Sequence, residues 1–591
     1  MKLTLEQLNN ASDLDALSAL KGIYEHSDWI AQISIKKRPF KSLASIKFEM
    51  MSAVSQATKD QKLSLLKSHP ELAGKAMVDN TLTRESKSEQ TQSGLTHCSA
   101  QEFQQIQSLN SAYNEKFGWP FILAVRGPRG TGLNRTQIIE TFERRLTNSL
   151  DLEFEECLRQ VHRIAEIRLN DKFGISPTLG HELWDWHEAL AVYSDPGFKE
   201  HNQLTVTYLT KAHINCAKDI KQLMLGCGFD SVHIDAVGNV VGKYLGREQG
   251  AQSKFLMTGS HYDTVRNAGK YDGRLGIFAP IMCVRELSKS GTRLKHGIEV
   301  VAFAEEEGQR FSATFLGSGS LVGTFDPKWL SQKDSDSISM IDAMRSAGLD
   351  ISEISNLRRD PSKYIGFVEV HIEQGPVLNE IGLPIGVVTS INGSIRYLVE
   401  IRGVSAHAGT TPMNKRQDAL CAASELTLYM EQRAKEDSQS VATVGQMHVP
   451  NGSVNVIPGS CKFSMDIRAP IDTQRDRLAE DIIKKLESTC KERGLSYTLQ
   501  ETLRISAAPS APELQAFWEE AVTSVGLPLH KMPSGAGHDA MKIHEIMPQA
   551  MLFVRGEHSG ISHNPLESTT SDDMQLCVEA LMQLLMNACN S

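Results

Sequence analysis

The residues best suited to metal chemistry lie in a glycine-rich loop that runs from Gly259 to Gly276. His261 and Asp272 lie in this loop, directly after an apolar run (255–257) that predicts a short buried strand. Open α/β sheets place their sites at the carboxyl ends of such strands. Imidazole and carboxylate together suit a borderline divalent cation such as Zn, Mn or Co. Asp263 is spaced to accept the other ring N–H of His261 and to set its tautomer.

The same pattern recurs after three later apolar runs, and this recurrence is a stronger signal than one His and one Asp. Carboxylates or imidazoles follow each run: Glu305-Glu306-Glu307-Gly308 after 298–304, His371-Ile372-Glu373-Gln374-Gly375 after 365–370, and Ser562-His563-Asn564-Pro565 in the loop after 550–554. Strand ends of this kind can meet at one edge of a sheet. The pattern therefore predicts a centre in which histidines and a shared carboxylate hold two metal ions for hydrolysis.

Length and composition set the class of protein. A chain of 591 residues exceeds what one hydrophobic core usually supports, so two to four domains are expected. The net charge of −9 comes from interspersed acids and bases, which argues against a nucleic-acid partner. No apolar run is long enough to cross a membrane, and the first residues lack the apolar core of a signal peptide. The ten cysteines form no Cys-x-x-Cys pair, which fits a reduced, cytoplasmic compartment. Together with the apolar runs, this predicts a cytoplasmic enzyme with no membrane partner.

The first 170 residues have a helical pattern. Apolar residues recur at spacings of three and four from Leu5 to Leu169, and runs typical of strands are nearly absent. The last helix is expected to end near Asn170, before Gly174 and Pro177. The pattern predicts an all-α domain over residues 1–172.

Three polar islands interrupt that pattern, at 68–74, 86–90 and 110–127. In the first, His69 precedes a proline and is therefore expected at a helix end. Together, in this order and spacing, the islands resemble the decarboxylases of 2-oxo-4-hydroxy-4-carboxy-5-ureidoimidazoline (OHCU), which make (S)-allantoin. The resemblance implies that His69 is the catalytic acid/base and that no cofactor is needed, because a carbanion left by loss of carbon dioxide needs only one positioned proton donor. It also implies the residues that hold the substrate: Pro70, Ser86, Glu89, Gln90, Ile122 and Arg168.

The pattern changes again between Pro384 and about Glu501. Runs typical of strands alternate there with two helical stretches, 417–434 and 475–493. This alternation predicts a self-contained α+β domain inserted into the catalytic domain, where it can serve as a lid or a dimerisation surface. The expected fold is therefore multidomain: an all-α domain at 1–172, an α/β dinuclear metallohydrolase domain at 180–386 and 503–591, and the inserted α+β domain at 387–502.

The polar islands of the second half complete a second resemblance. They lie at 403–413, 455–458, 466–468 and 534–539, and they add to the four motifs that follow the apolar runs. From about 180 to 587 the chain resembles the dinuclear amidohydrolases related to aminoacylases and carboxypeptidases. The branch it resembles most holds allantoate amidohydrolases and N-carbamoyl-amino-acid hydrolases.

That resemblance implies a role for individual residues. One metal ion is expected on His261, Asp272 and His371, and the other on Asp272, Glu307 and His563, so that Asp272 bridges two divalent ions. Mn is the first choice, with Zn, Co and Ni as alternatives. Glu306 is expected to be the general base, and His407, reaching in from a partner subunit, to donate to the oxyanion. The substrate carboxylate is expected to be held by Arg468, Asn455, Gln374, Gly535 and Gly537.

The two resemblances point to one route of purine degradation. The leading hypothesis is a bifunctional enzyme that decarboxylates OHCU to (S)-allantoin and hydrolyses allantoate to ureidoglycine, ammonia and carbon dioxide. Neither half opens the allantoin ring, so an allantoinase is expected elsewhere in the cell. One alternative is that the second half acts on N-carbamoyl amino acids, and another is that one half is a non-catalytic scaffold. The expected partners are small ureide substrates and a second copy of the chain, bound through the inserted domain.

Overall fold

The computed structural model describes residues 2–73, 86, 89, 98–248, 250 and 252–591. Its Cα positions divide into two compact units, described separately here. Unit 1 comprises Met1–Gly386, Ala516–His530 and Leu552–Ser591, and unit 2 comprises Val387–Gln515 and Lys531–Met551. No helix in the described part of the chain is long and apolar enough to span a membrane.

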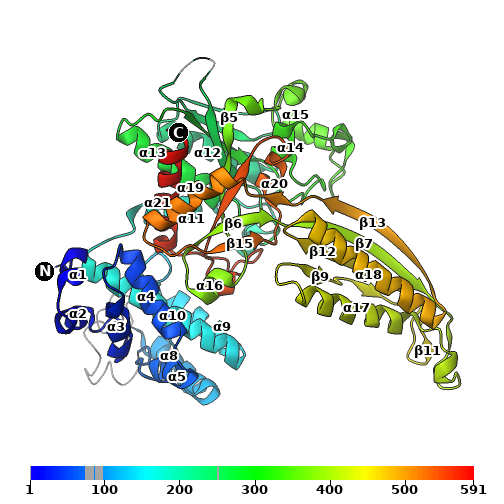
Figure 1. Cartoon of the computed structure of the whole chain (residues 1–591), viewed down its shortest axis with the longest axis horizontal. Coiled ribbons are helices and arrows are strands. Elements are labelled where there is room, and N and C mark those ends of the chain that lie inside the picture. The colour runs from blue at the N-terminus through cyan, green and yellow to red at the C-terminus, as the bar shows by residue number, and fades with distance from the viewer. Residues whose placement is uncertain (1, 74–85, 87–88, 90–97, 249, 251) are drawn as a thin grey trace. The chain divides into compact units, whose positions relative to one another are not determined.

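In the N-terminal part of unit 1, all the secondary-structure elements of the described residues are helices, which confirms the helical pattern (Figure 1). Most of its helices begin at a Ser, Thr or Asn whose side chain accepts a hydrogen bond from the first turn, for example Thr4, Ser42 and Ser99. The α-helices are α1 (Leu5–Asn10), α2 (Asp13–Leu20), α3 (Asp28–Ser34), α4 (Leu43–Ser55), α5 (Lys59–Lys67), α8 (Ala100–Phe117), α9 (Arg135–Leu146) and α10 (Leu150–Phe173).

Helix α10 is the longest of these helices and ends later than expected. It continues to Phe173 rather than stopping near Asn170. Gly174 lies in the left-handed region with φ of 63° and caps the helix, its N–H reaching back to the last turn. The glycine, and not the change in apolar spacing, therefore sets the end of the helix.

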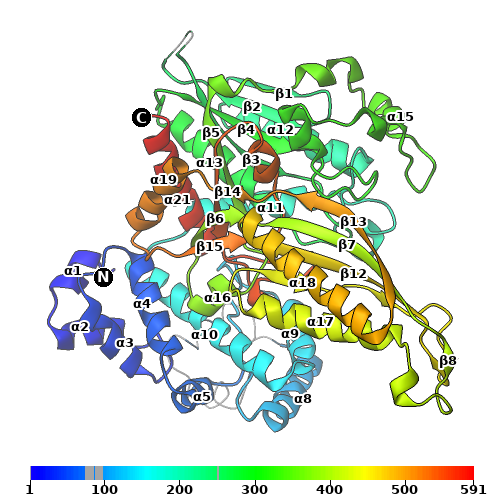
Figure 2. The same ribbon diagram turned by 45° about the vertical axis from the view of Figure 1, so that its right-hand side comes forward.

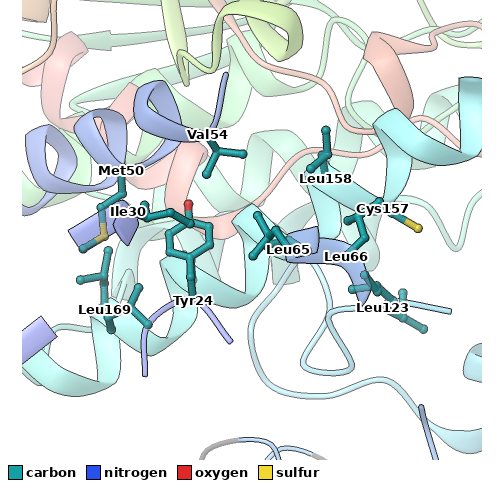
Figure 3. Packing of buried hydrophobic residues seen from close by; sticks show 14 of the residues in the cluster. Tyr24, Ile30, Met50, Val54, Leu65, Leu66, Leu123, Cys157, Leu158 and Leu169 are labelled. Atoms are coloured by element: carbon teal, nitrogen blue, oxygen red, sulfur yellow. The ribbon is translucent and has the colours of Figure 1, made fainter. Parts of the chain in front are cut away.

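Side chains from the first helices and from α10 meet in one apolar core. Figure 3 shows part of it, with Tyr24 from the segment between α2 and α3, Met50 and Val54 from α4, and Leu158 and Leu169 from α10. A fully buried ion pair borders this core: the Arg145 guanidinium donates to the Glu153 carboxylate at 3.0 and 2.5 Å. Arg145 also donates to the carbonyl of Ile122 at 2.7 Å. The pair therefore ties α9, α10 and the segment after α8 together.

The rest of unit 1 is an α/β domain. Its strands lie in the order β1 (Ser231–Ile234), β2 (Val240–Tyr244), β4 (Gly297–Phe303), β3 (Phe255–His261), β5 (Tyr364–Ile372) and β16 (Gln549–Val554). Strands β4 and β5 both run parallel to β3, so their carboxyl ends share one edge of the sheet. Helices α13 (Leu275–Lys289) and α21 (Ser571–Ala588) pack together, with α13 against β3 and β5.

Shorter helices complete this α/β domain. Helix α12 begins at Lys211, where the Thr210 side chain accepts from His213 N and caps it. The remaining α-helices are α11 (Thr178–Leu190), α12 (Lys211–Gly226), α14 (Leu316–Val322), α15 (Met340–Ser346) and α16 (Val377–Ile381).

Unit 2 contains an antiparallel sheet in the order β10 (Met447–His448), β12 (Ser460–Ala469), β7 (Gly393–Arg402) and β13 (Ser496–Ile505). The two long helices α17 (Ala419–Lys435) and α18 (Asp472–Arg493) lie along this sheet (Figure 2). Alternate residues of β12 are buried against them, as expected for a sheet covered on one face. The predicted α+β alternation is thus present, while the predicted limits at 387–502 stay a prediction beside the wider unit 2.

The Arg145–Glu153 pair yields a stability prediction. Replacing Arg145 by Met leaves the Glu153 carboxylate buried without its counter-charge, which should lower the free energy of unfolding of the helical domain by about 3–5 kcal/mol. Calorimetric unfolding of the full chain measures this change. The matched control is Arg135→Met, because Arg135 pairs with Glu102 at the surface and should contribute less than about 1 kcal/mol. Equal destabilisation by the two variants would contradict a special role for the buried pair.

Candidate functional sites

The residues predicted to bind metal come from strand ends in unit 1. His261 closes β3, His371 lies at the end of β5, and Glu307 follows β4. Parallel pairing places His261 opposite Phe303, the last residue of β4. His563 comes from the loop that connects β16 to α21. The sheet therefore brings together residues that are far apart in sequence.

Asp272 lies at the middle of this group. Its Oδ1 is 3.2 Å from His371 Nε2 and 3.6 Å from His261 Nε2. Its Oδ2 is 3.1 Å from His563 Nε2, which is itself 3.5 Å from Glu307 Oε1. Two sets of potential ligand atoms, each within 4.8 Å of one another, share this one carboxylate: His261, Asp272 and His371, and Asp272, Glu307 and His563. The arrangement is that of two adjacent cation sites with a common ligand.

The charges in this cluster favour cations. Burial works to raise the pKa of Asp272, but hydrogen bonds from His261, His371 and His563 hold it well below its usual range. Burial and the Asp272 charge raise the pKa of Glu307 to about 7. The hydrogen bond to Asp272 raises the pKa of His563 to about 9. Imidazole nitrogens and carboxylate oxygens that compete for protons in a buried site fit a pair of divalent ions, which would supply the positive charge instead.

Asp263 orders the residues around this cluster. Its Oδ1 is 3.2 Å from His261 Nδ1, the ring nitrogen that Asp263 was expected to contact. Its two carboxylate oxygens also accept hydrogen bonds from the backbone N–H groups of Glu306 and Glu307, each at 3.1 Å. One carboxylate therefore orients both a potential ligand imidazole and the acidic segment after β4. As a result, ligand atoms of Glu306, Glu307 and His261 also lie within 4.8 Å of one another.

Gly273 provides the space that the cluster needs. Its φ is 67°, and a Cβ atom built on it would lie 2.4 Å from the carbonyl oxygen of His261 and 2.6 Å from the imidazole ring. Any other residue would displace His261, so the glycine-rich character of the loop has a steric cause.

Two further residues contact the cluster. The role of Gln374 in binding a carboxylate stays a prediction, and its Nε2 donates to Asp272 Oδ2 and to Ser562 Oγ, both at 3.1 Å. Glu567 was not predicted at all. Its Oε1 accepts from the N–H groups of Tyr271 and Asp272 at 2.9 and 3.0 Å, and its Oε2 accepts from Ser562 at 2.7 Å. No motif marks Glu567, and only its position after the Ser-His-Asn-Pro segment could have suggested a role.

Unit 2 holds the remaining predicted residues of the hydrolase. His407 lies in the short strand β8 (Ala406–His407) and pairs with Val456 of β11 (Val456–Ile457), directly after Asn455. The His407 side chain is exposed, and its Nδ1 accepts from the N–H groups of Gly409 and Thr410 at 3.0 and 3.2 Å. The two residues expected to contact substrate thus share one two-stranded segment.

Arg468 is held in a fixed orientation within unit 2. Its Nε and one terminal nitrogen donate to the two carboxylate oxygens of Asp466 at 2.9 and 3.0 Å. Its other terminal nitrogen donates to the carbonyl oxygen of Gly535 at 2.7 Å. The structure therefore brings Arg468 and Gly535 together as expected, and Gly537 lies two residues further along the same segment.

A second polar site lies in the helical domain. Arg168 of α10 donates to the two carboxylate oxygens of Glu89 at 2.8 and 2.9 Å and to Glu25 at 2.9 Å. Ser86 donates to Glu25 at 3.1 Å. Glu25 is buried and was not predicted, because it lies between helices in a segment without a motif. The structure thus assembles Ser86, Glu89 and Arg168 around an additional carboxylate.

His69 lies directly after helix α5, as expected for a residue before proline, and is buried. Burial, together with the smaller effects of Arg168 and His26, lowers the pKa of His69 to about 4, although the Glu25 charge opposes this shift. Its Nε2 accepts or donates no hydrogen bond among the described residues. Pro70 follows it half-buried, Ile122 is buried in the helical core, and Gln90 lies outside the described residues.

Comparison with known proteins identifies both halves. The family model of OHCU decarboxylase matches residues 9–170, and that of peptidase family M20/M25/M40 matches residues 257–587. Both resemblances inferred from the motifs are therefore confirmed.

Individual relatives match the second half. An N-carbamoyl-L-amino acid amidohydrolase of Geobacillus stearothermophilus is 38% identical over 59% of this chain and 85% of that protein. The allantoate deiminase of Arabidopsis thaliana is 36% identical over 64% of this chain and 77% of that protein. The allantoate amidohydrolase of Bacillus subtilis is 34% identical over 68% of this chain and 97% of that protein.

A solved structure is also similar to most of this chain. The amidase of the hydantoinase/carbamoylase family from Burkholderia multivorans has a TM-score of 0.64 and 30% identity, and the match covers 70% of this chain and 98% of that one. The chain therefore belongs to peptidase family M20/M25/M40, and it carries an OHCU decarboxylase domain fused to the N-terminal side of its amidohydrolase half.

Proposed function

We propose that the second half of the chain hydrolyses allantoate to ureidoglycine, ammonia and carbon dioxide, and that the helical domain converts OHCU to (S)-allantoin. The observation that carries this proposal is the cluster around Asp272, with Glu306 beside it, in the same chain as a decarboxylase domain of purine breakdown. Two of the similar proteins act on allantoate by name. An allantoinase, supplied separately, has to open the ring between the two reactions.

The residues of the cluster divide the hydrolytic work among them. His261, Asp272 and His371 would hold one cation, and Asp272, Glu307 and His563 the other. When bound, such cations polarise a carbonyl and lower the pKa of a water molecule. Mn is our first choice, with Zn, Co and Ni as alternatives.

Glu306 is positioned to take a proton from the attacking water, because Asp263 fixes its backbone next to the cluster. In return it can protonate the departing nitrogen, so that the proton balance closes within the site. Arg468, oriented by Asp466, offers its guanidinium to the substrate carboxylate. Asn455 and Gly537, also in unit 2, are proposed to help hold the same carboxylate.

His407 completes this proposal from a second copy of the chain. Exposed apolar side chains lie close to it in sequence and beside its partner strand β11, and they can contribute to an interface. These residues are Val404, Met413 and Val454. We propose that unit 2 forms a homodimer and delivers His407 to the oxyanion in the partner's site.

In the helical domain, the neutral imidazole of His69 is the proposed acid/base. A pKa of about 4 keeps the ring uncharged near pH 7, so it can accept a proton from the bound substrate. It then returns this proton to the carbanion once carbon dioxide has left. Arg168 and Ser86 supply the fixed donors that a substrate carboxylate or ureido oxygen needs.

The competing substrate class is the N-carbamoyl amino acids, because the relative with 38% identity acts on them by name. We expect the purified full chain to hydrolyse allantoate with a kcat/KM at least about tenfold above that for N-carbamoyl amino acids, since specificity is a ratio of these constants. Ammonia release with each substrate measures this ratio. A chelator should abolish the activity and Mn should restore it, while decarboxylation continues. The reverse substrate order would establish the alternative function.

Subunit sharing of the site predicts complementation. Glu306→Gln and His407→Ala should each lower kcat for hydrolysis by about 100-fold or more. When the two variants are mixed and allowed to exchange subunits, about a quarter of the wild-type activity should return, because half of the dimers are mixed and each then has one intact site. Mixing each variant with itself is the control. If no activity returns although exchange is verified, His407 does not act across a dimer.

The two active sites are expected to be separable. His69→Ala should lower the rate of OHCU decarboxylation by about 100-fold or more, because it removes the proton carrier. Allantoate hydrolysis should stay at the wild-type rate in the same protein. His26→Ala is a matched control, since His26 neighbours the site electrostatically but has no proposed proton-transfer role. Loss of both activities in His69→Ala would show that the halves do not work independently.

A further inference from the structure

The loop that carries His563 contacts both the metal cluster and helix α10, besides its own internal hydrogen bonds, such as that from Glu557 N–H to the Ser568 carbonyl at 2.7 Å. We define the His563 loop as residues 555–570, between β16 and α21. Three of its non-glycine residues, His558, Ser559 and His563, have φ between 53° and 57°. Left-handed backbone of this kind costs free energy for residues with a Cβ, so it persists only where the surroundings hold it.

On one side, the loop is joined to the metal cluster. His563 reaches Asp272, and Glu567 accepts from Ser562 and from the backbone of the loop that carries Asp272. If the His563 loop moves, these contacts to the metal cluster are lost.

On the other side, the loop is joined to helix α10 of the decarboxylase domain. Arg159 of α10 donates to the Glu557 carboxylate at 2.7 Å, and Arg555 donates to the Glu166 carboxylate of α10 at 3.1 Å. Glu557 in turn accepts from Ser568 at 2.7 Å, so it links the two arms of the loop. Burial works to raise the pKa of Glu557, but the Arg159 charge keeps it below its usual range.

The start of α21, immediately after the loop, is held in the same way. The Asp572 carboxylate accepts from Arg163 at 2.6 Å and from Asn170 at 2.7 Å, both on α10, and from Lys47 of α4 at 2.6 Å. Both ends of the His563 loop are thus anchored on one helix of the other domain.

These charged contacts border a cavity of about 480 Å³. Arg159, Glu166, Arg555 and Glu557 are among the residues that line it. Because open space adjoins the loop there, fewer dispersion contacts hold it on that side, and the ion pairs with α10 act beside the hydrogen bond from Asn379 of α16 to the Gly556 carbonyl.

We propose that Arg159 and Glu557 are positioning residues for the hydrolase site, through which α10 of the decarboxylase domain holds the His563 loop at the cation site formed by Asp272, Glu307 and His563. The inference rests on the proposed function of that site. It makes the decarboxylase domain a structural part of the amidohydrolase centre. Removing a residue that orients a metal ligand typically lowers metal affinity by about 10- to 100-fold.

The test measures metal binding by the full chain. Arg159→Met and Glu557→Gln should each weaken binding of one of two Mn ions by about tenfold or more, seen by competition with a chelating dye, while the other ion stays tightly bound. In the metal-free protein, amide hydrogen exchange over residues 557–570 should be faster than in the wild type. Arg159→Lys, which keeps the charge but not the fork, should lie between Arg159→Met and the wild type.

The matched control is Arg129→Met. Arg129 of the helical domain pairs with Asp185 of α11, so it joins the same two domains without touching the His563 loop. Binding of both ions and exchange in the loop should be unchanged in this variant. OHCU decarboxylation serves as the folding check in every variant, because Arg159 lies about two and a half turns of α10 away from Arg168.

The outcomes separate the two proposals. If the wild type binds no pair of ions, the proposed hydrolytic function fails. If the wild type binds two and Arg159→Met and Glu557→Gln bind both with unchanged affinity and loop exchange, the proposed function stands and the positioning role is wrong. If Arg129→Met weakens binding equally, domain attachment in general, and not the His563 loop contacts, is responsible, which also overturns the inference.

Discussion

The buried carboxylate of Asp272 is the feature on which the hydrolase half depends. It lies within 3.6 Å of three imidazole nitrogens that arrive from two strand ends and one loop. A carboxylate in such a place is stable only with positive charge around it, and protons on the imidazoles or bound cations can supply that charge. The parallel order of β4, β3 and β5 makes the arrangement possible, because it puts their carboxyl ends at one edge.

Two carboxylates beside the cluster, Asp263 and Glu567, orient the backbone around Asp272. Asp263 accepts from the backbone of Glu306 and Glu307, and Glu567 accepts from the backbone of Asp272 itself. Each therefore fixes the main chain that carries a reactive side chain. Two of the loops that form the site are thus held to their neighbours by a charged acceptor.

Helix α10 makes ion pairs with both halves of the chain. Arg168, near its end, donates to Glu25 and Glu89 in the decarboxylase site. Arg159, Arg163 and Glu166 of the same helix make ion pairs with the segment that leads from β16 into α21. Fusion of the two domains has thus produced a junction rich in buried charge, and buried pairs of this kind are sensitive to loss of either partner. No residue proposed for one of the two sites is also proposed for the other.

The amino-acid sequence by itself determined the division of this protein into a helical decarboxylase domain and an amidohydrolase half, and it predicted the residues that the structure brings together around Asp272. Apolar spacing predicted the helical first domain and the α+β alternation after Pro384. The motifs at strand ends predicted one group of residues: His261, Asp272, Glu307, His371 and His563. Both predictions were possible because periodicity and motif spacing are local properties of the chain. Only the tertiary structure decided the roles of Glu25, Glu567 and Gln374. Their contacts join segments that are far apart in sequence, and a single carboxylate or amide in a loop carries no local pattern that tells which distant backbone it will meet. The end of α10 at Gly174 and its ion pairs with the His563 loop were decided in the same way, by cap geometry and by packing between domains.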